Sequence, residues 1–326
     1  MIGPRLTIAA AIVTAVVVTA AAVAGILGLD VSLGLIDPRV QASAPVLDLE
    51  APAVIAAGEP ATVVVTSLSA TGSLPVVVRA GTTTHRFTVE VEAGLARLEL
   101  DQTLTGQAGV LDLRAGSLAT TIEITPGPVV GDFPVLAGPH TVVANGADHA
   151  VAVAIPRDRW GNPAASGTEV VYTWTQPGPG TSTGSSRVDR GIAWVELVSG
   201  TKSGWTGISA AAESAVGVEA RITEVPGAAS QLVMEPVVVV GSEVGDAVEL
   251  RSGPIADRFG NTIPDGVEGR FGVETARGPH IVPGTVQGGR LRAWWVPVPG
   301  AITISAAVNG VSSPPLTMTV VEDQQK

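Results

Sequence analysis

A five-residue segment of this chain occurs twice, and this repeat constrains the fold more than any other feature of the sequence. The segment Asp158-Arg159-Trp160-Gly161-Asn162 returns as Asp257-Arg258-Phe259-Gly260-Asn261, so residue 158 becomes residue 257 at an offset of 99. At the same offset Gly167 returns as Gly266, and Tyr172 as Phe271. A fixed period of this size predicts a tandem array of similar structural units.

Each copy of the segment lies between two predicted strands. Before the first copy, Val151, Val153 and Ile155 alternate with alanines, so one side of the strand carries the bulkier apolar side chains. The repeated Asp and Asn end the strand because their side chains hydrogen-bond nearby backbone, and Gly161 and Gly260 are expected to hold positive φ angles. We expect the aromatic side chain in each copy to fold back onto the core of its own unit.

The ends of the units are marked by hairpins and short linkers. Paired strand patterns end near residues 125, 225 and 320, and the last pair turns at Asn309-Gly310, a strong hairpin signal. Pro126-Gly127 and Pro226-Gly227 follow the first two hairpins and predict short linkers. The chain contains no cysteine, so each unit must be stabilised by its apolar core alone. The sequence therefore predicts an all-β protein with three tandem immunoglobulin-like β-sandwiches, at 49–125, 126–225 and 226–321, and a tail at 322–326.

One family shares these motifs. The segment 144–148 (Ala-Asn-Gly-Ala-Asp), followed by a strand, Asp158–Pro163 and Gly167–Tyr172, resembles the bacterial Ig-like domains of the invasin/intimin type. The resemblance covers 127–225 and extends to 226–321 through Asp257–Asn261, whereas 49–125 is included only by analogy. It implies a surface stalk or adhesive array without catalytic residues. The outer-membrane barrel and the lectin-like tip of that family are missing from this sequence, so their receptor function is not carried over.

The N-terminus indicates export. Residues 6–29 are uncharged and apolar, and at about 1.5 Å per residue a helix of this length crosses the roughly 30 Å hydrocarbon core of a bilayer. Arg5 precedes this run, which predicts a cytoplasmic terminus at 1–5, a single-pass anchor at 6–29 and an external tether at 30–48. Alternatively, 6–29 is a signal peptide cleaved after Ala24, and the protein is secreted.

Composition and motifs argue against several functions. The net charge of −11, with lysine only at 202 and 326, disfavours a nucleic-acid surface. No phosphate loop, nucleophile elbow or zinc-protease helix is present, so we expect no enzyme. Asp148, Asp158 and Asp257 could offer oxygen ligands to calcium, but no dense acidic cluster surrounds them. The sequence therefore predicts neither a metal nor another cofactor.

The tryptophans and one loop remain as candidates for recognition. Trp174 and Trp295 fall on the inward phase of their strands, whereas Trp194 and Trp294 align with Arg97 and are expected to face outward. The outward pair could pack at a sheet edge, contact a neighbouring unit or bind a ligand. The segment Gln176–Ser186, rich in Pro, Gly, Ser and Thr, is interpreted as a flexible connection.

Two functions are consistent with these patterns. The first is a membrane-anchored surface protein whose Ig-like units form a stalk for adhesion or for binding another protein. The second is an accessory subunit of a larger envelope machine, such as a secretion, conjugation or pilus-like assembly. The sequence does not identify the protein or cell-surface ligand.

Overall fold

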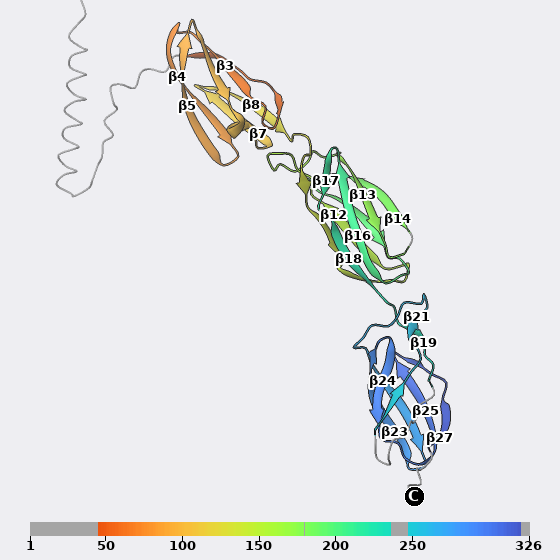
Figure 1. Ribbon diagram of the computed structural model, residues 1–326. Helices are drawn as coiled ribbons and strands as arrows, with labels where there is room; N and C mark the ends of the chain where they lie inside the picture. The colour runs from red at the N-terminus through yellow and green to blue at the C-terminus, as the bar shows by residue number, and fades with distance from the viewer. Residues whose placement is uncertain (1–44, 179, 236–246, 321–326) are drawn as a thin grey trace, which may run out of the picture.

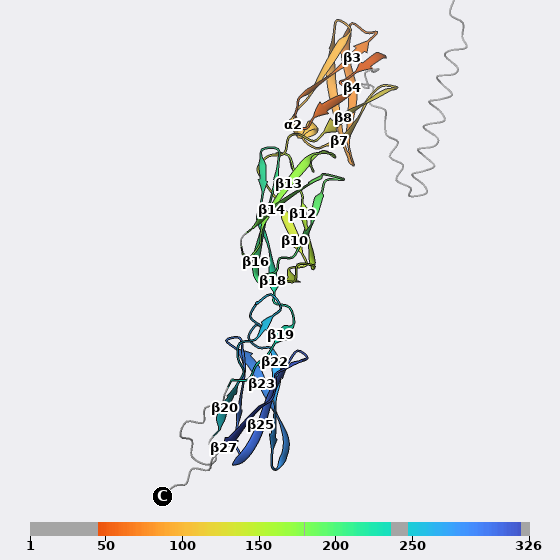
Figure 2. The same cartoon turned by 90° about the vertical axis from the view of Figure 1, so that its right-hand side faces the viewer.

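The computed structural model describes residues 45–178, 180–235 and 247–320. Their apolar side chains are buried in three separate cores, within residues 49–124, 129–222 and 229–308. We call the residues around these cores unit 1 (45–125), unit 2 (126–225) and unit 3 (226–320). Two views at 90° to one another show the units following each other along a line (Figures 1 and 2).

The predicted N-terminal and C-terminal segments lie mostly outside the described residues. These are the cytoplasmic terminus 1–5, the span 6–29, most of the tether 30–48 and the tail 322–326. Within the described residues, no helix has both the length and the apolar character needed to cross a membrane. The helix described in unit 1, α2 (Gln102–Thr105), is a single short turn.

Unit 1 is an eight-stranded sheet that folds into two layers. Its strand order is β1-β3-β6-β5-β4-β7-β8-β2, with β2 parallel to β8. Strict alternation of side chains places one face of each strand in the core, so every second residue of β3 is buried. The strands are β1 (Val46–Glu50), β2 (Val54–Ala56), β3 (Ala61–Ser67), β4 (Thr71–Ala80), β5 (Thr83–Glu92), β6 (Leu95–Leu100), β7 (Gly109–Ala115) and β8 (Leu118–Thr125). Strand β1 begins inside the predicted tether because Val46 and Asp48 pair with β3.

Unit 2 consists of two sheets, β10-β12-β15 and β11-β18-β16-β13-β14, with β9 and β17 at the edge of the second. Strand β11 runs parallel to β18, as β2 does to β8, and this two-layer arrangement is that of an immunoglobulin-like sandwich. The strands are β9 (Asp132–Phe133), β10 (Val135–Gly138), β11 (Thr141–Val143), β12 (His149–Ala154), β13 (Glu169–Thr175), β14 (Thr181–Arg187), β15 (Ala193–Val198), β16 (Gly204–Ala212), β17 (Ala215–Gly217) and β18 (Ala220–Val225).

Strand β12 faces the core with its small side chains. Its alanines at 150, 152 and 154 are buried, whereas Val151 is exposed. The bulkier apolar side therefore points outward. The reason is the fully buried Tyr172, whose hydroxyl accepts a hydrogen bond of 3.2 Å from the backbone amide of Ala154. Alanines leave room for this ring, which larger side chains on β12 would displace.

The segment Gln176–Ser186 is largely a strand, and its interpretation as a flexible connection is wrong. Strand β14 (Thr181–Arg187) pairs with β13 from Thr181↔Thr175 to Arg187↔Glu169. Threonine and serine favour extended backbone when a partner strand supplies the hydrogen bonds, so apolar anchors are not needed at a sheet edge. Composition alone did not reveal that partner.

Unit 3 repeats the arrangement with a small sheet, β19-β21, and a larger one, β20-β24-β23-β22-β25-β26, in which β27 also pairs with β25. The predicted turn at Asn309-Gly310 is confirmed: both residues have positive φ, and Val308 pairs with Val311 across the turn. The strands are β19 (Ala229–Gln231), β20 (Val248–Arg251), β21 (Ala256–Asp257), β22 (Glu268–Thr275), β23 (Gly278–Gln287), β24 (Arg290–Trp295), β25 (Gly300–Val308), β26 (Val311–Ser312) and β27 (Leu316–Val320).

Candidate functional site: the joints between units and the exposed tryptophans

The repeated aspartate organises a closed turn. The Oδ1 atom of Asp158 accepts hydrogen bonds from the backbone amides of Trp160 (2.8 Å) and Asn162 (2.9 Å). Its Oδ2 atom accepts from the Asn162 side chain (2.8 Å) and from the backbone amide of Gly127 (2.9 Å). Because Gly127 belongs to the Pro-Gly linker, the same carboxylate fixes both the turn and the linker that enters unit 2.

The second copy makes the same four bonds. Oδ1 of Asp257 accepts from the amides of Phe259 and Asn261, both at 2.9 Å. Its Oδ2 accepts from the Asn261 side chain at 2.8 Å and from the linker amide of Gly227 at 2.9 Å. The repeat in sequence is therefore a repeat in hydrogen bonding.

The repeated asparagine reaches the preceding unit. Asn162 Oδ1 accepts from the amide of Ala108 at 2.8 Å, and its Nδ2 donates to the carbonyl of Gly106 at 2.8 Å. Asn261 repeats this with the amide of Ser203 at 2.9 Å and the carbonyl of Thr201 at 3.0 Å. Each amide side chain thus forms a donor–acceptor pair with a loop of the unit before it. We call these two contacts joint 1 (units 1 and 2) and joint 2 (units 2 and 3).

The aromatic residue of the first copy also belongs to the joint. The indole of Trp160 lies so close to unit 1 that a Cβ atom built on Gly58 would be 2.3 Å from its Nε1 atom, and one built on Gly106 would be 3.0 Å from its Cε3 atom. Glycines at these two positions therefore let the ring lie flat on the backbone of unit 1. The expectation that Trp160 folds back onto its own core is wrong, because the turn lies at the end of unit 2 that meets unit 1.

Joint 2 replaces this ring packing with polar contacts. The Lys202 ammonium donates to the carbonyl of Phe259 at 2.7 Å, and Arg258 donates to the carbonyl of Asn145 at 3.3 Å. Phe259 is not among the described side chains that pack into the core of unit 3, so the expected fold-back fails here too. In both copies the preceding arginine stacks on the aromatic ring, with 4.8 and 4.6 Å between the guanidinium carbon and the ring centroid.

The turns also require their glycines. Gly161 has φ of +84° and Gly260 has φ of +80°, as the sequence predicts. Residues with a Cβ rarely adopt this left-handed region, whereas glycine enters it freely.

The two aspartates are held in their charged form. Burial disfavours the charge, but the hydrogen bonds from the asparagine side chain, the linker amide and the turn amides outweigh it. The pKa of Asp158 and the pKa of Asp257 therefore both lie below the usual aspartate value. With both oxygen atoms already accepting two hydrogen bonds, these carboxylates serve as structural acceptors.

The loop that receives Asn261 is itself fixed by a buried carboxylate. Glu224, only 1% exposed, accepts hydrogen bonds from the amide of Gly200 (2.6 Å) and the hydroxyl of Thr206 (2.5 Å), at either end of the loop. In unit 1 the equivalent loop contains helix α2, which Asp101 caps through the amide of Thr103 at 3.0 Å. Sequence reasoning missed both receiving loops, because they share no residue pattern and offer only backbone atoms to the asparagine.

The two tryptophans predicted to face outward lie on outer sheet faces, and a third exposed tryptophan, Trp205, lies two residues from Ser203 of joint 2. Trp194 on β15 is 56% exposed and Trp294 on β24 is 69% exposed, as expected, whereas Trp174 and Trp295 pack against their cores. Around Trp194 the face is apolar, because Leu136, Val153 and Trp194 follow one another across β10, β12 and β15. Around Trp294 the neighbours are largely polar.

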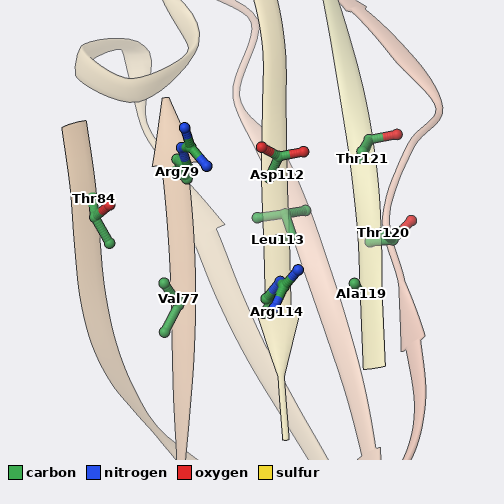
Figure 3. A pocket seen from close by; sticks show the side chains of 9 residues that line it. All are labelled: Val77, Arg79, Thr84, Asp112, Leu113, Arg114, Ala119, Thr120 and Thr121. Carbon is green, nitrogen blue, oxygen red and sulfur yellow. The ribbon is translucent and has the colours of Figure 1, made fainter. Parts of the chain in front are cut away.

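Other candidate sites offer little chemistry. Asp148 accepts from the amides of Val143 and His149 and forms a turn. Among the described residues, no three His, Cys, Asp or Glu side chains gather in a group that could hold a metal ion. A hollow of about 570 Å³ on the outer face of β4, β7 and β8 contains Arg79, Asp112 and Arg114 (Figure 3). Its lining contains threonine hydroxyls and one carboxylate, Asp112, but no histidine, cysteine or lysine.

No protein-family model and no curated protein matches this sequence. Among solved structures, the chain is similar to invasin, a bacterial integrin-binding protein, at 17% identity and a TM-score of 0.49, covering 86% of this chain and 60% of invasin. It is similar to InvD of Yersinia pseudotuberculosis at 13% identity and a TM-score of 0.49, covering 84% of this chain and 98% of InvD. It is similar to the Escherichia coli adhesin FdeC at 16% identity and a TM-score of 0.43, covering 85% of this chain and 99% of FdeC. These matches include the invasin type of array to which the sequence motifs point.

Proposed function

We propose that this chain is a membrane-anchored bacterial surface protein, held by residues 6–29, whose three Ig-like sandwiches form a stalk for adhesion or for binding another protein. The observation that carries the proposal is that the same joint is built twice. In each joint one aspartate fixes the linker and one asparagine bonds the preceding unit. A chain that only needed three folded units would not require this bonding between them. Joints of this kind hold the far end of an array away from its point of attachment.

Protease treatment of intact, wall-stripped cells tests the location. We expect digestion of the units that follow the tether, with residues 1–29 left in the membrane. Protection of the units would contradict the proposal. A mature terminus at Gly25 would instead indicate the secreted form. Attachment of cells to a surface or to other cells, compared with a strain lacking the gene, tests the adhesive role.

A subunit of a larger envelope machine is the second candidate, and the outer face of unit 2 favours it. Leu136, Val151 and Trp194 expose apolar surface on one side of β10, β12 and β15. Contiguous apolar patches on soluble proteins commonly mark contacts with other proteins. Cross-linking on intact cells followed by mass spectrometry separates the two candidates. Cross-links to other envelope proteins support the machine, and cross-links to molecules from outside the cell support adhesion.

A further inference from the structure

A groove of about 380 Å³ lies beside the most exposed tryptophan, on the outer face of β22, β23 and β24 in unit 3. Binding sites for small molecules usually occupy about 300–1,000 Å³, so this volume is at the lower end of that range. The side chains that line the groove are Glu268, Pro283, Thr285, Gln287, Arg292 and Trp294.

The backbone explains why the groove opens here. Strands β23 and β24 pair only from Thr285↔Arg292 to Gln287↔Arg290. Beyond Thr285 comes Pro283, which has no amide hydrogen to donate to a neighbouring strand. Gly284 lies between them, and a Cβ atom there would be 2.7 Å from the carbonyl oxygen of Arg292. Strands β23 and β24 are thus paired at one end and separate towards Pro283 and Trp294.

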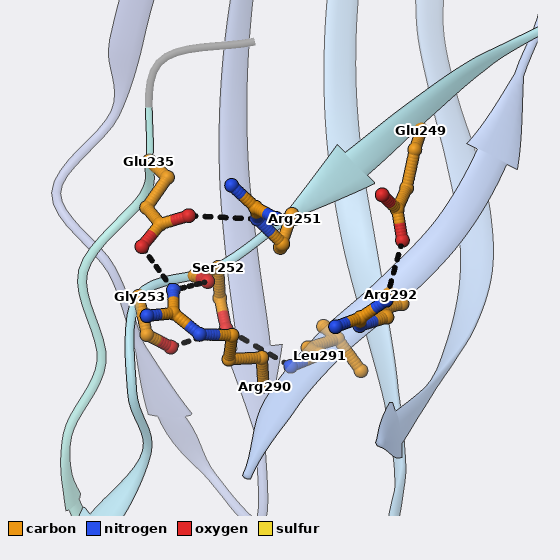
Figure 4. A network of polar contacts seen from close by, with 8 residues as sticks. All are labelled: Glu235, Glu249, Arg251, Ser252, Gly253, Arg290, Leu291 and Arg292. Carbon is orange, nitrogen blue, oxygen red and sulfur yellow. Dashed lines mark hydrogen bonds and ion pairs between the residues drawn. The ribbon is translucent and has the colours of Figure 1, made fainter. Parts of the chain in front are cut away.

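One polar side chain that lines the groove, Arg292, and two arginines beside it are held by ion pairs (Figure 4). Arg292 Nη1 is 3.3 Å from Glu249 Oε1, and Glu249 is also the cross-strand partner of Trp294. Nearby, Glu235 bonds both Arg251, at 2.7 Å, and Arg290. These pairs orient the arginine side chains before any ligand arrives, so binding need not order them.

The lining combines one flat aromatic face with hydrogen-bonding groups of both kinds. Trp294 supplies an exposed indole ring, Gln287 and Thr285 can each donate and accept, Glu268 accepts and Arg292 donates. Arg292 is already paired with Glu249, so the carboxylate of Glu268 gives the groove a net negative charge, which disfavours an anionic ligand. A buried peptide anchor would need a deep apolar pocket, and Trp294 and Pro283 alone do not form one.

We propose that this groove binds the pyranose ring of a neutral saccharide, stacked by its C–H face on Trp294. The ring hydroxyls bond to Glu268, Gln287, Thr285 and Arg292 at its rim. A pyranose has the matching chemistry, with an apolar face and an edge of hydroxyl groups that donate and accept. The inference rests on the proposed adhesive function and gives that function a ligand class.

Unit 2 supplies a matched control. Trp194 occupies the equivalent outward position on β15 and is also exposed. Its cross-strand neighbours, Val153 and then Leu136, are apolar and offer no hydrogen bonds to hydroxyl groups. An exposed tryptophan whose cross-strand neighbours are apolar should hold a sugar poorly, so the two positions distinguish specific recognition from non-specific apolar binding.

The test is calorimetric titration of the full chain in detergent micelles with methyl pyranosides and neutral disaccharides, such as those of glucose, galactose, mannose and N-acetylglucosamine. We expect saturable binding of at least one of them. Trp294→Ala should weaken it by about tenfold or more, the scale expected when a central aromatic contact is removed. Gln287→Ala should weaken it by a smaller factor, and Trp194→Ala should leave it unchanged. Because Trp294 and Gln287 are exposed, the variants should keep the melting midpoint of the native chain.

Absence of binding at millimolar sugar would overturn the inference, as would an equal loss in Trp194→Ala. A protein ligand captured through Trp294 and not displaced by free sugar would assign the groove to a protein and overturn it as well. Failure of this inference can be told apart from failure of the proposed function. If Trp294→Ala cells still attach, only the saccharide site is lost, whereas units protected from protease on intact cells contradict the surface role itself.

Discussion

At the scale of single residues, the asparagine of each repeat must satisfy hydrogen-bond partners in two units at once. Asn162 and Asn261 are buried, and each bonds its own aspartate and the preceding unit at the same time. An amide is the only neutral side-chain group that donates and accepts from adjacent atoms in one plane, so it can match a backbone amide and carbonyl together. An aspartate at this position would place a second carboxylate beside Asp158 or Asp257.

The glycine of the turn gives a direct test at this scale. Gly161→Val forces a branched side chain into φ near +84°, and we expect a loss of about 1–3 kcal/mol in the free energy of unfolding, the usual cost of such strain. Gly161→Asn should lose much less, because asparagine tolerates the left-handed region. Chemical denaturation of residues 45–326 measures both. Equal stability of the native chain and the valine variant would show that the turn does not need a glycine.

Acid should loosen the joints through the two aspartates. Their folded pKa values lie below the unfolded value of about 3.9, so the stability they contribute is fully present above that pH and is lost as pH falls through the folded pKa. A protonated carboxyl also accepts hydrogen bonds less well from the amides of Gly127 and Gly227. We therefore expect the distribution of distances between units to stay narrow from neutral pH to about pH 4 and to broaden below that pH.

Distances between spin labels measure this change. The chain has no cysteine, so labels can be placed on cysteines introduced at exposed positions such as Thr183 in unit 2 and Ala276 in unit 3. An Asp257→Asn variant is the control: its distance distribution should be broad already at neutral pH and should respond less to acid. The same acid response in the variant and the native chain would rule out Asp257 as its source.

At the scale of structural elements, the receiving loops matter as much as the repeated turns. The loop of unit 2 is pinned by Glu224, whose carboxylate is almost fully buried and accepts from Gly200 and Thr206. Removing a buried acceptor leaves its donors without partners, which costs about 1–3 kcal/mol for each group. The rigidity of joint 2 therefore depends on a residue outside the repeated segment.

A substitution at Glu224 separates the two roles of this loop. Glu224→Ala leaves the Gly200 and Thr206 donors unpaired, so it should destabilise unit 2 by about 2–6 kcal/mol and also broaden the distribution of distances between units 2 and 3. Glu219→Ala, a change in an exposed ion pair shortly before Glu224, should alter stability by less than about 0.5 kcal/mol. Thermal unfolding and the spin-label distances are the measurements. A broadened joint after Glu219→Ala would show that the effect is not specific to the buried carboxylate.

The sequence allowed part of this site to be predicted, and the physical reason for the rest is clear. Asp, Gly and Asn have strong local preferences, so the turn and the positive φ of Gly161 could be predicted from the repeat. The partners of Asn162 are backbone atoms of Gly106 and Ala108. Because every residue type offers the same backbone groups, such a contact cannot be recognised from the sequence. Strand β14 pairs with β13, the strand directly before it, and the inward alanines of β12 make room for Tyr172, but neither partner could be read from the residue types of β14 or β12.

At the scale of the whole molecule, the two joints predict an extended particle in solution. Units with strands of about 8 residues at roughly 3.3 Å each, plus loops, are about 35–40 Å long. Three in line give a rod of about 100–120 Å with a radius of gyration near 30–35 Å, whereas one globule of the same residues would have a radius of gyration near 19 Å. Small-angle scattering from residues 45–326 tells the two apart.

The same measurement tests the asparagines. An Asn162→Ala, Asn261→Ala double variant loses four hydrogen bonds between units, and its scattering should report a more flexible chain with a broader range of end-to-end distances. Thr262→Ala, a change at an exposed residue beside Asn261, should scatter like the native chain. A radius of gyration near 19 Å for the native chain would mean side-by-side packing and would contradict the stalk.

The hydrogen bonds of the repeated asparagine place their side-chain specificity in the unit that follows, whereas the ring packing at Gly58 and Gly106 and the Lys202 contact depend on the unit before. The preceding unit contributes main-chain atoms to the asparagine, which any sequence of the right loop shape provides. An in-frame copy of residues 126–225 inserted after residue 225 would bring its own linker and turn, and its asparagine would meet a loop of unit 2 that already binds an asparagine through main-chain atoms. A gene of this design can therefore gain or lose whole units in single recombination events and keep the hydrogen bonds of the asparagine, so only the contacts of the aromatic residue need matching changes in the neighbours. The length of the array then changes by one unit at a time.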